Sequence, residues 1–302
     1  MKRPTALTQT WLRRHPLPDP FATEDKEDRG RVLVIGGSAK VPGAVLLGGK
    51  AALHAGAGKL HIATARSLAP SLAVTLPEAM VSPVPINAKG EIASLPATIL
   101  GAAAETDALL LGPGMTRGST TDALVAKLLR KTQAGCVIDA GAIGKGLRAL
   151  QDDTDCIVTP HAGEMAAATG MERRAIEAKP DRIAMEFASA YRCIVVMKGV
   201  PTFIATPVGN LLRFDIRAPG LGTSGSGDAL AGIITGLLAR GTPALAAAAW
   251  GVWLHGQAGM QLGRDVGPVG YLARDISAYV PALMERARGG AAARNRRARS
   301  AG

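Results

Sequence analysis

The chain of 302 residues is poor in aromatic residues and cysteine and has no long apolar run. Aromatic residues make up 3% of it, which disfavours proteins that stack exposed bases, so we expect no nucleic-acid partner. The three cysteines, Cys136, Cys156 and Cys193, lie far apart in apolar segments and are predicted to be reduced core residues. Without a membrane-spanning run or the apolar core of a signal peptide, the sequence predicts a cytoplasmic protein with no membrane partner.

Two familiar nucleotide-binding motifs are also missing. The segment from Gly36 to Ala44 follows a predicted strand and is rich in glycine. Its spacing matches neither the Gly-x-Gly-x-x-Gly fingerprint of dinucleotide-binding folds nor the phosphate loop that ends in Gly-Lys-Ser/Thr. Both of those folds are therefore disfavoured.

The net charge of +11 is unevenly distributed. Six of the positive charges come from arginines near the end of the chain: Arg286, Arg288, Arg294, Arg296, Arg297 and Arg299. This composition predicts a basic, disordered tail over residues 286–302, which is more typical of a solvated end than of an RNA-binding segment. We expect an N-terminal extension over residues 1–24 and one domain over residues 25–285.

The remaining composition, 47% apolar and 20% charged, is enough to bury a large core. Short β-rich runs alternate with longer Ala/Leu segments, which predicts an α/β fold of three αβα layers with a mostly parallel central sheet flanked by helices. We expect strands over 31–35, 59–63, 108–111, 136–138, 156–159, 194–198 and 202–205, and helices over 43–55, 120–131, 163–169, 181–190, 228–239 and 244–262. A turn at 206–210 predicts an antiparallel hairpin.

The segment 218–240 places a glycine-rich turn, one carboxylate and an apolar helix in succession. Glycines at 222, 225 and 227 leave backbone N–H groups free to converge on an anion at the positive end of the helix dipole. We expect the amides of Gly225, Ser226 and Gly227 to stabilise a transferring phosphoryl group and Asp228 to act as general base. An aspartate here could simply cap the helix, but a plain cap does not require so many exposed amides.

Several other predicted strands end in tight turns that carry polar groups. These turns are Leu111-Gly-Pro-Gly-Met115, Asp139-Ala-Gly-Ala-Ile143, Thr159-Pro-His-Ala-Gly-Glu164 and Lys198-Gly-Val-Pro-Thr202. Ligands of open parallel sheets bind beyond the carboxyl ends of the strands, so these turns are candidates for chemistry.

Taken in order, these motifs resemble those of the ribokinase-like superfamily: Gly-Pro-Gly, Thr-Pro-His-x-Gly-Glu, Lys-Gly-x-x-Thr and Gly-Ser-Gly-Asp. Two further segments, Gly36-Gly-Ser with Gly43-Ala44 and Ala51-Ala-Leu-His-Ala-Gly-Ala-Gly58, make the chain similar to the ADP/ATP-dependent NAD(P)H-hydrate dehydratases over about residues 25–284.

The resemblance implies a ribokinase-like fold and a carbon–oxygen lyase that repairs nicotinamide cofactors. Such an enzyme dehydrates the S epimer of NADH or NADPH hydrate and releases AMP and phosphate from ADP, or ADP and phosphate from ATP. We expect ADP as donor, with Mg²⁺. The resemblance further implies a separate NAD(P)H-hydrate epimerase in the same pathway and a homo-oligomer of four or more subunits.

The same resemblance implies roles for particular residues. The hydrate is expected to contact Ala44, Gly114, His161 and Asp228. The adenine nucleotide is expected to contact Lys198, Gly199, Val200, Pro201, Thr202 and Gly227. Glu164 is expected to hold Mg²⁺ through water, although an acidic residue in a first helical turn is also favoured by the helix dipole alone.

Two positions depart from the family pattern: Gly141 stands where a second aspartate is usual, and Ala162 replaces the proline after His161. Two other functions remain open at this point. One is a ribokinase-like kinase that phosphorylates a vitamin precursor, either hydroxymethylpyrimidine or hydroxyethylthiazole. The other is a nucleotide sensor that binds without turnover.

Overall fold

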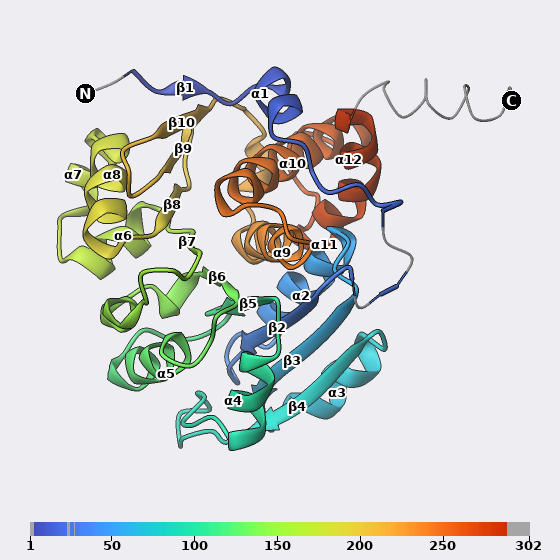
Figure 1. The fold of residues 1–302 in the computed structure, drawn as a ribbon, viewed down its shortest axis with the longest axis vertical. Coiled ribbons are helices and arrows are strands. Elements are labelled where there is room, and N and C mark those ends of the chain that lie inside the picture. The colour runs from blue at the N-terminus through green and yellow to red at the C-terminus, as the bar shows by residue number, and fades with distance from the viewer. Residues whose placement is uncertain (1–2, 23–24, 27, 289–302) are drawn as a thin grey trace, which may run out of the picture.

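The computed structural model describes residues 3–22, 25–26 and 28–288 (Figure 1). Its strands are β1 (Thr5–Ala6), β2 (Arg31–Gly36), β3 (Lys59–Ala65), β4 (Ala79–Val84), β5 (Ala108–Leu111), β6 (Gly135–Ile138), β7 (Cys156–Val158), β8 (Ile194–Met197), β9 (Thr202–Ala205) and β10 (Leu211–Phe214). Its α-helices are α1 (Gln9–Arg14), α2 (Ala44–His54), α3 (Ala69–Thr75), α4 (Ala97–Ala104), α5 (Ser119–Leu129), α6 (Ala162–Thr169), α7 (Arg173–Ala178), α8 (Pro180–Tyr191), α9 (Ser226–Ala239), α10 (Ala244–Asp265), α11 (Ala273–Ile276) and α12 (Val280–Arg288). Short 3₁₀ helices occur at η1 (Ala140–Ala142), η2 (Lys145–Ala149), η3 (Pro219–Leu221) and η4 (Ser277–Tyr279).

The strands form one sheet in the order β1-β10-β9-β8-β7-β6-β5-β2-β3-β4. All neighbouring strands are parallel except that β9 runs antiparallel to both β8 and β10. The turn at 206–210 joins β9 to β10 in an antiparallel hairpin, as the sequence predicts. The carboxyl ends of β5, β6, β7 and β8 therefore meet at one edge of the sheet.

Alternating side chains of β2 show why the sheet is covered on both faces. Val32 and Val34 lie in one buried cluster with residues of α2, α9 and α10. Leu33 and Ile35 lie in a second cluster with residues of α4, α5 and α8. Because successive strand side chains point to opposite faces, an unbroken apolar strand requires helices on both sides. Figure 1 shows these two helical layers, and the predicted three-layer αβα architecture is confirmed.

The described part of the N-terminal extension packs onto the domain. Strand β1 pairs in parallel with β10, and α1 contacts α12 and α10. The indole Nε1 of Trp250 donates a hydrogen bond to the carbonyl oxygen of His15 at 2.8 Å. At the other end, α12 continues to Arg288, so Arg286 and Arg288 lie in a helix and the tail boundary predicted at residue 286 is too early. Residues 289–302, the rest of the predicted tail, lie outside the described residues.

The elements expected from the sequence are present with small shifts in their ends. The sequence patterns do not predict the edge strands β1 and β4 or the helices α1, α3, α4, α7, α11 and α12. Strand β4 is only partly buried and contains Pro83, which hides its strand pattern. The three cysteines are buried and free, as predicted. Among the described residues, no helix is long and apolar enough to span a membrane.

Candidate active site

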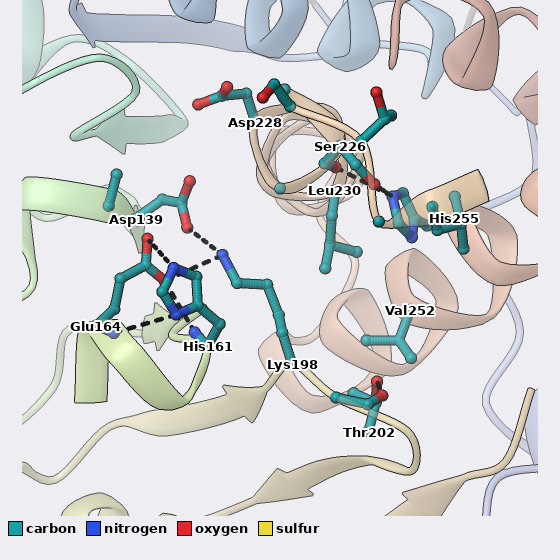
Figure 2. Close-up of a pocket in the computed structure, with 18 of the residues that line it drawn as sticks. Asp139, His161, Glu164, Lys198, Thr202, Ser226, Asp228, Leu230, Val252 and His255 are labelled. Carbon is teal, nitrogen blue, oxygen red and sulfur yellow. Dashed lines mark hydrogen bonds and ion pairs between the residues drawn. The ribbon is translucent and has the colours of Figure 1, made fainter. Parts of the chain in front are cut away.

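A pocket of about 1090 Å³ opens at the carboxyl end of the sheet. Gly114 follows β5, Asp139 follows β6, His161 follows β7 and Lys198 follows β8, and all four line the pocket. The opposite wall comes from the N-terminus of α9 and from α10. Figure 2 shows the two walls facing each other, with Asp228 above Asp139 and Lys198. The volume is at the upper end of the range for ligand sites and suits a ligand larger than one mononucleotide.

The glycine-rich turn forms a helix start with unpaired amides. Gly225 has φ +88°, and a Cβ on it would overlap the side chain of Leu47, so only glycine fits there. Helix α9 begins at Ser226, two residues before the start predicted from the sequence, and has no side-chain cap. The N–H of Ser226, which is predicted to contact the phosphoryl group, donates to the carbonyl oxygen of Thr223 at 3.3 Å and is not free, whereas within the described residues the N–H groups of Gly227 and Asp228 donate to no acceptor. They can therefore bind an anion at the positive end of α9.

Asp228 is the third residue of α9 rather than its cap, so the capping explanation for this residue is wrong. Its partly buried side chain lines the pocket. The pKa of Asp228 is raised from 3.8 to about 7, chiefly by burial and then by the negative charge of Asp139, against the opposing effect of Lys198. A carboxyl group with a pKa near neutrality is suited to accept a proton as a general base.

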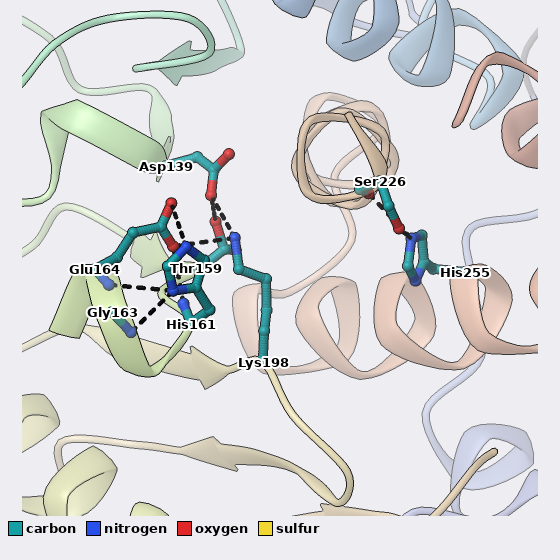
Figure 3. Close-up of polar contacts among 8 residues, drawn as sticks. All are labelled: Asp139, Thr159, His161, Gly163, Glu164, Lys198, Ser226 and His255. Atoms are coloured by element: carbon teal, nitrogen blue, oxygen red, sulfur yellow. Dashed lines mark hydrogen bonds and ion pairs between the residues drawn. The ribbon is translucent and has the colours of Figure 1, made fainter. Parts of the chain in front are cut away.

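Lys198 supplies the positive charge of the pocket. Its Nζ lies 3.1 Å from Asp139 Oδ1 and 3.3 Å from Glu164 Oε2 (Figure 3). Burial by itself lowers the pKa of Lys198, but the two carboxylates outweigh this effect and raise it, so the group stays an ammonium ion. A Cβ on Gly227 would lie 3.0 Å from Nζ, so the cation sits directly beside the amides of α9. The cation and the amides together can neutralise a phosphate group.

His161 is the N-cap of α6. Its Nδ1 accepts hydrogen bonds from the N–H groups of Gly163 at 2.9 Å and Glu164 at 3.2 Å, and Glu164 Oε2 accepts one from the His161 N–H at 2.8 Å. Because Nδ1 accepts, it carries no proton, and Nε2 of the neutral ring is the N–H donor. The exposed ring can thus offer a donor to a ligand while its other nitrogen holds the helix.

Asp139 has a larger part in the site than the sequence indicated. Its carboxylate is 2% exposed, and Oδ1 accepts from Thr159 Oγ1 at 2.6 Å as well as from Lys198. Ala140, the next residue, lies in the left-handed region at φ +50°, which is unusual for a residue other than glycine. Asp139 follows directly after a buried strand, and this position is the signal in the sequence that marks it. His255, in the middle of α10, also lines the pocket, and no motif marked it.

The structure brings most of the predicted site residues together, with two exceptions. Gly199, Val200 and Thr202 line the pocket beside Lys198. Ala44 and Pro201 do not. Ala44 is 2% exposed at the start of α2 and packs behind Gly114. A Cβ added to Gly114 would lie 3.1 Å from the methyl group of Ala44. The small side chain of Ala44 permits this close approach, and its contact with the hydrate stays a prediction.

The two departures from the family pattern have structural explanations. A Cβ on Gly141 would overlap the carbonyl oxygen of Met115, so this backbone has no space for an aspartate at that position. Ala162 is the first residue of α6, where proline is favoured but not needed. The His161 cap forms without it.

The carboxylates of the pocket fit a Mg²⁺ ion that takes most of its ligands from water and substrate phosphates. No group of three His, Cys, Asp or Glu side chains among the described residues is placed to hold a metal ion directly. Asp139 Oδ1 and Glu164 Oε2 already contact Lys198 and other donors. Among the described residues, Glu164 Oε1 accepts no hydrogen bond and lies 3.6 Å from His161 Nε2. Mg²⁺ keeps several water ligands and commonly takes the rest from substrate phosphates, so one such oxygen suffices.

Comparison with known proteins agrees with this site. The family model for NAD(P)H-hydrate dehydratase matches residues 32–282. An ADP-dependent (S)-NAD(P)H-hydrate dehydratase of Xanthomonas campestris is 48% identical over 284 residues, which is 94% of this chain and 97% of that protein. A bifunctional NAD(P)H-hydrate repair enzyme of Moorella thermoacetica is 36% identical over 92% of this chain and 53% of that protein, so the chain spans about half the length of the bifunctional relatives.

Solved structures show the same likeness. The ADP/ATP-dependent NAD(P)H-hydrate dehydratase of Bacillus subtilis, co-crystallised with ATP and Mg²⁺, superposes with a TM-score of 0.83 at 27% identity over 95% of this chain and all of that chain. A hydroxyethylthiazole kinase of Pyrococcus horikoshii reaches a TM-score of 0.56 at 14% identity, which shows a shared fold alone. The turns that line the pocket lie within the segment that the family model matches, and the relative from Xanthomonas campestris covers nearly the whole chain. The chain belongs to the NAD(P)H-hydrate dehydratase family.

Proposed function

We propose that this protein dehydrates the S epimer of NADH or NADPH hydrate back to the reduced cofactor, with ADP as phosphoryl donor. The observation that carries the proposal is Asp228: its pKa is raised to about 7, and it stands at the glycine turn of α9 beside Lys198. The 48% identity to an ADP-dependent dehydratase supports the choice of reaction and donor.

In the first step, the ring hydroxyl of the hydrate attacks the terminal phosphorus of the nucleotide. Asp228 takes the hydroxyl proton, and the bond from phosphorus to its bridging oxygen breaks to release AMP. The N–H groups of Gly227 and Asp228 and the ammonium of Lys198 stabilise the charge on the transferring group. Mg²⁺, when bound, would neutralise nucleotide phosphates, and Glu164 would hold it through water.

In the second step, phosphate leaves with the electrons of the carbon–oxygen bond. The lone pair of the ring nitrogen stabilises the resulting cation, and transfer of a proton from the neighbouring carbon to water restores the ring double bond. Phosphorylation therefore serves to turn a poor leaving group into a good one. We propose that His161 Nε2–H and Gly114 contact the hydrate and that the segment from Lys198 to Thr202, all of which lines the pocket except Pro201, contacts the nucleotide.

A separate epimerase in the same pathway and assembly into a homo-oligomer of four or more subunits stay predictions. The bifunctional relatives are about twice the length of this chain, which fits an epimerase acting in the same repair pathway.

The test measures recovery of dihydronicotinamide absorbance from purified (S)-NADH hydrate with Mg²⁺ and ADP, ATP or no nucleotide. Wild type is compared with Asp228→Asn and with Asp181→Asn, a matched change in the first turn of α8 outside the pocket. We expect the absorbance to recover only with ADP, with one phosphate released for each reduced cofactor formed. Recovery should be lost in Asp228→Asn and kept in Asp181→Asn. Accumulation of a stable phosphorylated product would instead indicate a small-molecule kinase, and nucleotide binding without phosphate release would indicate a sensor.

A further inference from the structure

A histidine–serine pair joins α10 to the first residue of α9 at the pocket wall. His255 Nε2 lies 3.0 Å from Ser226 Oγ and also 3.0 Å from the carbonyl oxygen of Ser226 (Figure 3). Both residues line the pocket, and Ser226 is only 5% exposed. The chemistry described above uses neither side chain.

The carbonyl oxygen decides which atom of this pair donates. A carbonyl oxygen can only accept, so Nε2 must carry a proton to be in hydrogen-bond contact with it. The same N–H is then shared between the carbonyl oxygen and Oγ of Ser226. Burial, helped by the positive charge of Lys198, lowers the pKa of His255 to about 4, so the ring is neutral and Nδ1 carries no proton.

This arrangement leaves the hydroxyl proton of Ser226 free. Since Oγ accepts from His255, its own O–H cannot point back at that nitrogen. Among the described residues, Ser226 Oγ has no hydrogen-bond partner other than His255, so its proton is available to a group bound in the pocket. The hydroxyl lies one residue from Gly227, whose N–H is also unpaired, so an anionic oxygen in the pocket would satisfy both.

We propose that His255 is a positioning residue that holds the Ser226 hydroxyl as a donor to an oxygen of the transferring phosphoryl group. This inference rests on the proposed function, because it assigns the hydroxyl to the same anion site. Ser226 would touch the reacting group, and His255 would act only through Ser226 by fixing its rotamer and the first turn of α9.

A double-mutant cycle tests the inference. Ser226→Ala removes the hydroxyl, His255→Phe keeps the ring volume but removes the donor, and His255→Gln restores an N–H donor. We expect Ser226→Ala to lower kcat about tenfold or more, as for loss of one donor to a transition-state anion, with the KM of the hydrate unchanged. His255→Phe should lower kcat in wild type but not further in Ser226→Ala, and His255→Gln should recover much of the rate.

The chain supplies a matched control. His54 Nδ1 lies 3.0 Å from Ser277 Oγ, so it also ties two elements through a serine, but it is outside the pocket. His54→Phe should change the melting temperature and leave kcat unchanged. If His255→Phe behaves like His54→Phe, or if its effect on kcat multiplies with that of Ser226→Ala, His255 does not act through Ser226 and the inference is wrong.

The experiment distinguishes failure of the proposed function from failure of the inference about His255 and Ser226. Wild-type protein is assayed first with (S)-NADH hydrate and ADP, and ADP binding to every variant is measured by calorimetry. An inactive wild type overturns the proposed function and the inference with it. An active wild type whose Ser226→Ala variant keeps full kcat overturns the inference alone.

Discussion

Lys198 and Asp139 form an ion pair at the floor of the pocket, with Nζ and Oδ1 3.1 Å apart. They come from neighbouring parts of the sheet, at the ends of β8 and β6, although 59 residues separate them. The pair acts on Asp228 in opposite directions, since Asp139 raises the pKa of Asp228 and Lys198 lowers it. The activity of the site should therefore depend on pH through these three residues.

The first prediction concerns that pH dependence. Asp228 must be ionised to take a proton, so kcat/KM should rise with pH up to about 7 and then level off. Asp139→Asn removes a like charge and should shift the acidic limb to lower pH, whereas Lys198→Met removes an opposite charge and should shift it to higher pH. Initial rates from pH 5 to 9 at low hydrate concentration measure the shifts. Equal limbs in all three proteins would contradict the role of Asp228.

The second prediction concerns stability. The pKa of Asp228 is higher in the folded protein than its ordinary 3.8, so the native state holds this proton more tightly and loses stability as pH rises from about 4 to about 7. Asp228→Asn removes that cost and should raise the melting temperature, more at pH 8 than at pH 5. Thermal denaturation at both pH values, with Asp181→Asn as control, checks the difference. A gain of equal size at both pH values would show that ionisation is not its cause.

The third prediction separates the two jobs of His161. His161→Ala loses the cap of α6 and should destabilise the protein by about 1 kcal/mol, whereas His161→Asn keeps a side chain that caps well. Both variants lose the Nε2–H donor, so both should raise the KM of the hydrate. The stability of His161→Asn should change little. Melting temperatures and steady-state kinetics of the two variants are compared. A normal KM in His161→Asn would leave His161 with the structural role alone.

The fourth prediction concerns the glycine turn. Gly225→Ala forces an alanine into φ +88° and against Leu47, and should cost about 1–3 kcal/mol of stability. Gly227→Ala places a methyl 3.0 Å from the flexible end of Lys198, which can move, so the fold should persist. The methyl would occupy the space proposed for the phosphate, and ADP affinity should fall about tenfold, or 1.4 kcal/mol. Calorimetric titration and thermal denaturation together distinguish the two effects, and unchanged ADP affinity in Gly227→Ala would argue against phosphate binding there.

Much of the site could be predicted from local patterns. The turns after β5, β6, β7 and β8 and the start of α9 can be recognised from the sequence, because each places glycine or a polar residue after an apolar strand or before an apolar helix. Asp228 was identified in this way, although its helix starts two residues earlier than expected. The resemblance assigns Ala44 to the hydrate, and the structure shows it buried behind Gly114, so this contact stays a prediction.

The sequence by itself determined the αβα layers, the turns that carry polar groups and the carboxylate at the helix start, because period, glycine content and strand ends are local properties. Only the tertiary structure decided the electrostatics. The neutralisation of Asp139 by Lys198, the raised pKa of Asp228 and the contact of His255 with Ser226 each depend on burial and on distances between residues far apart in the chain. Those distances arise when the sheet and its two helical layers close around the pocket.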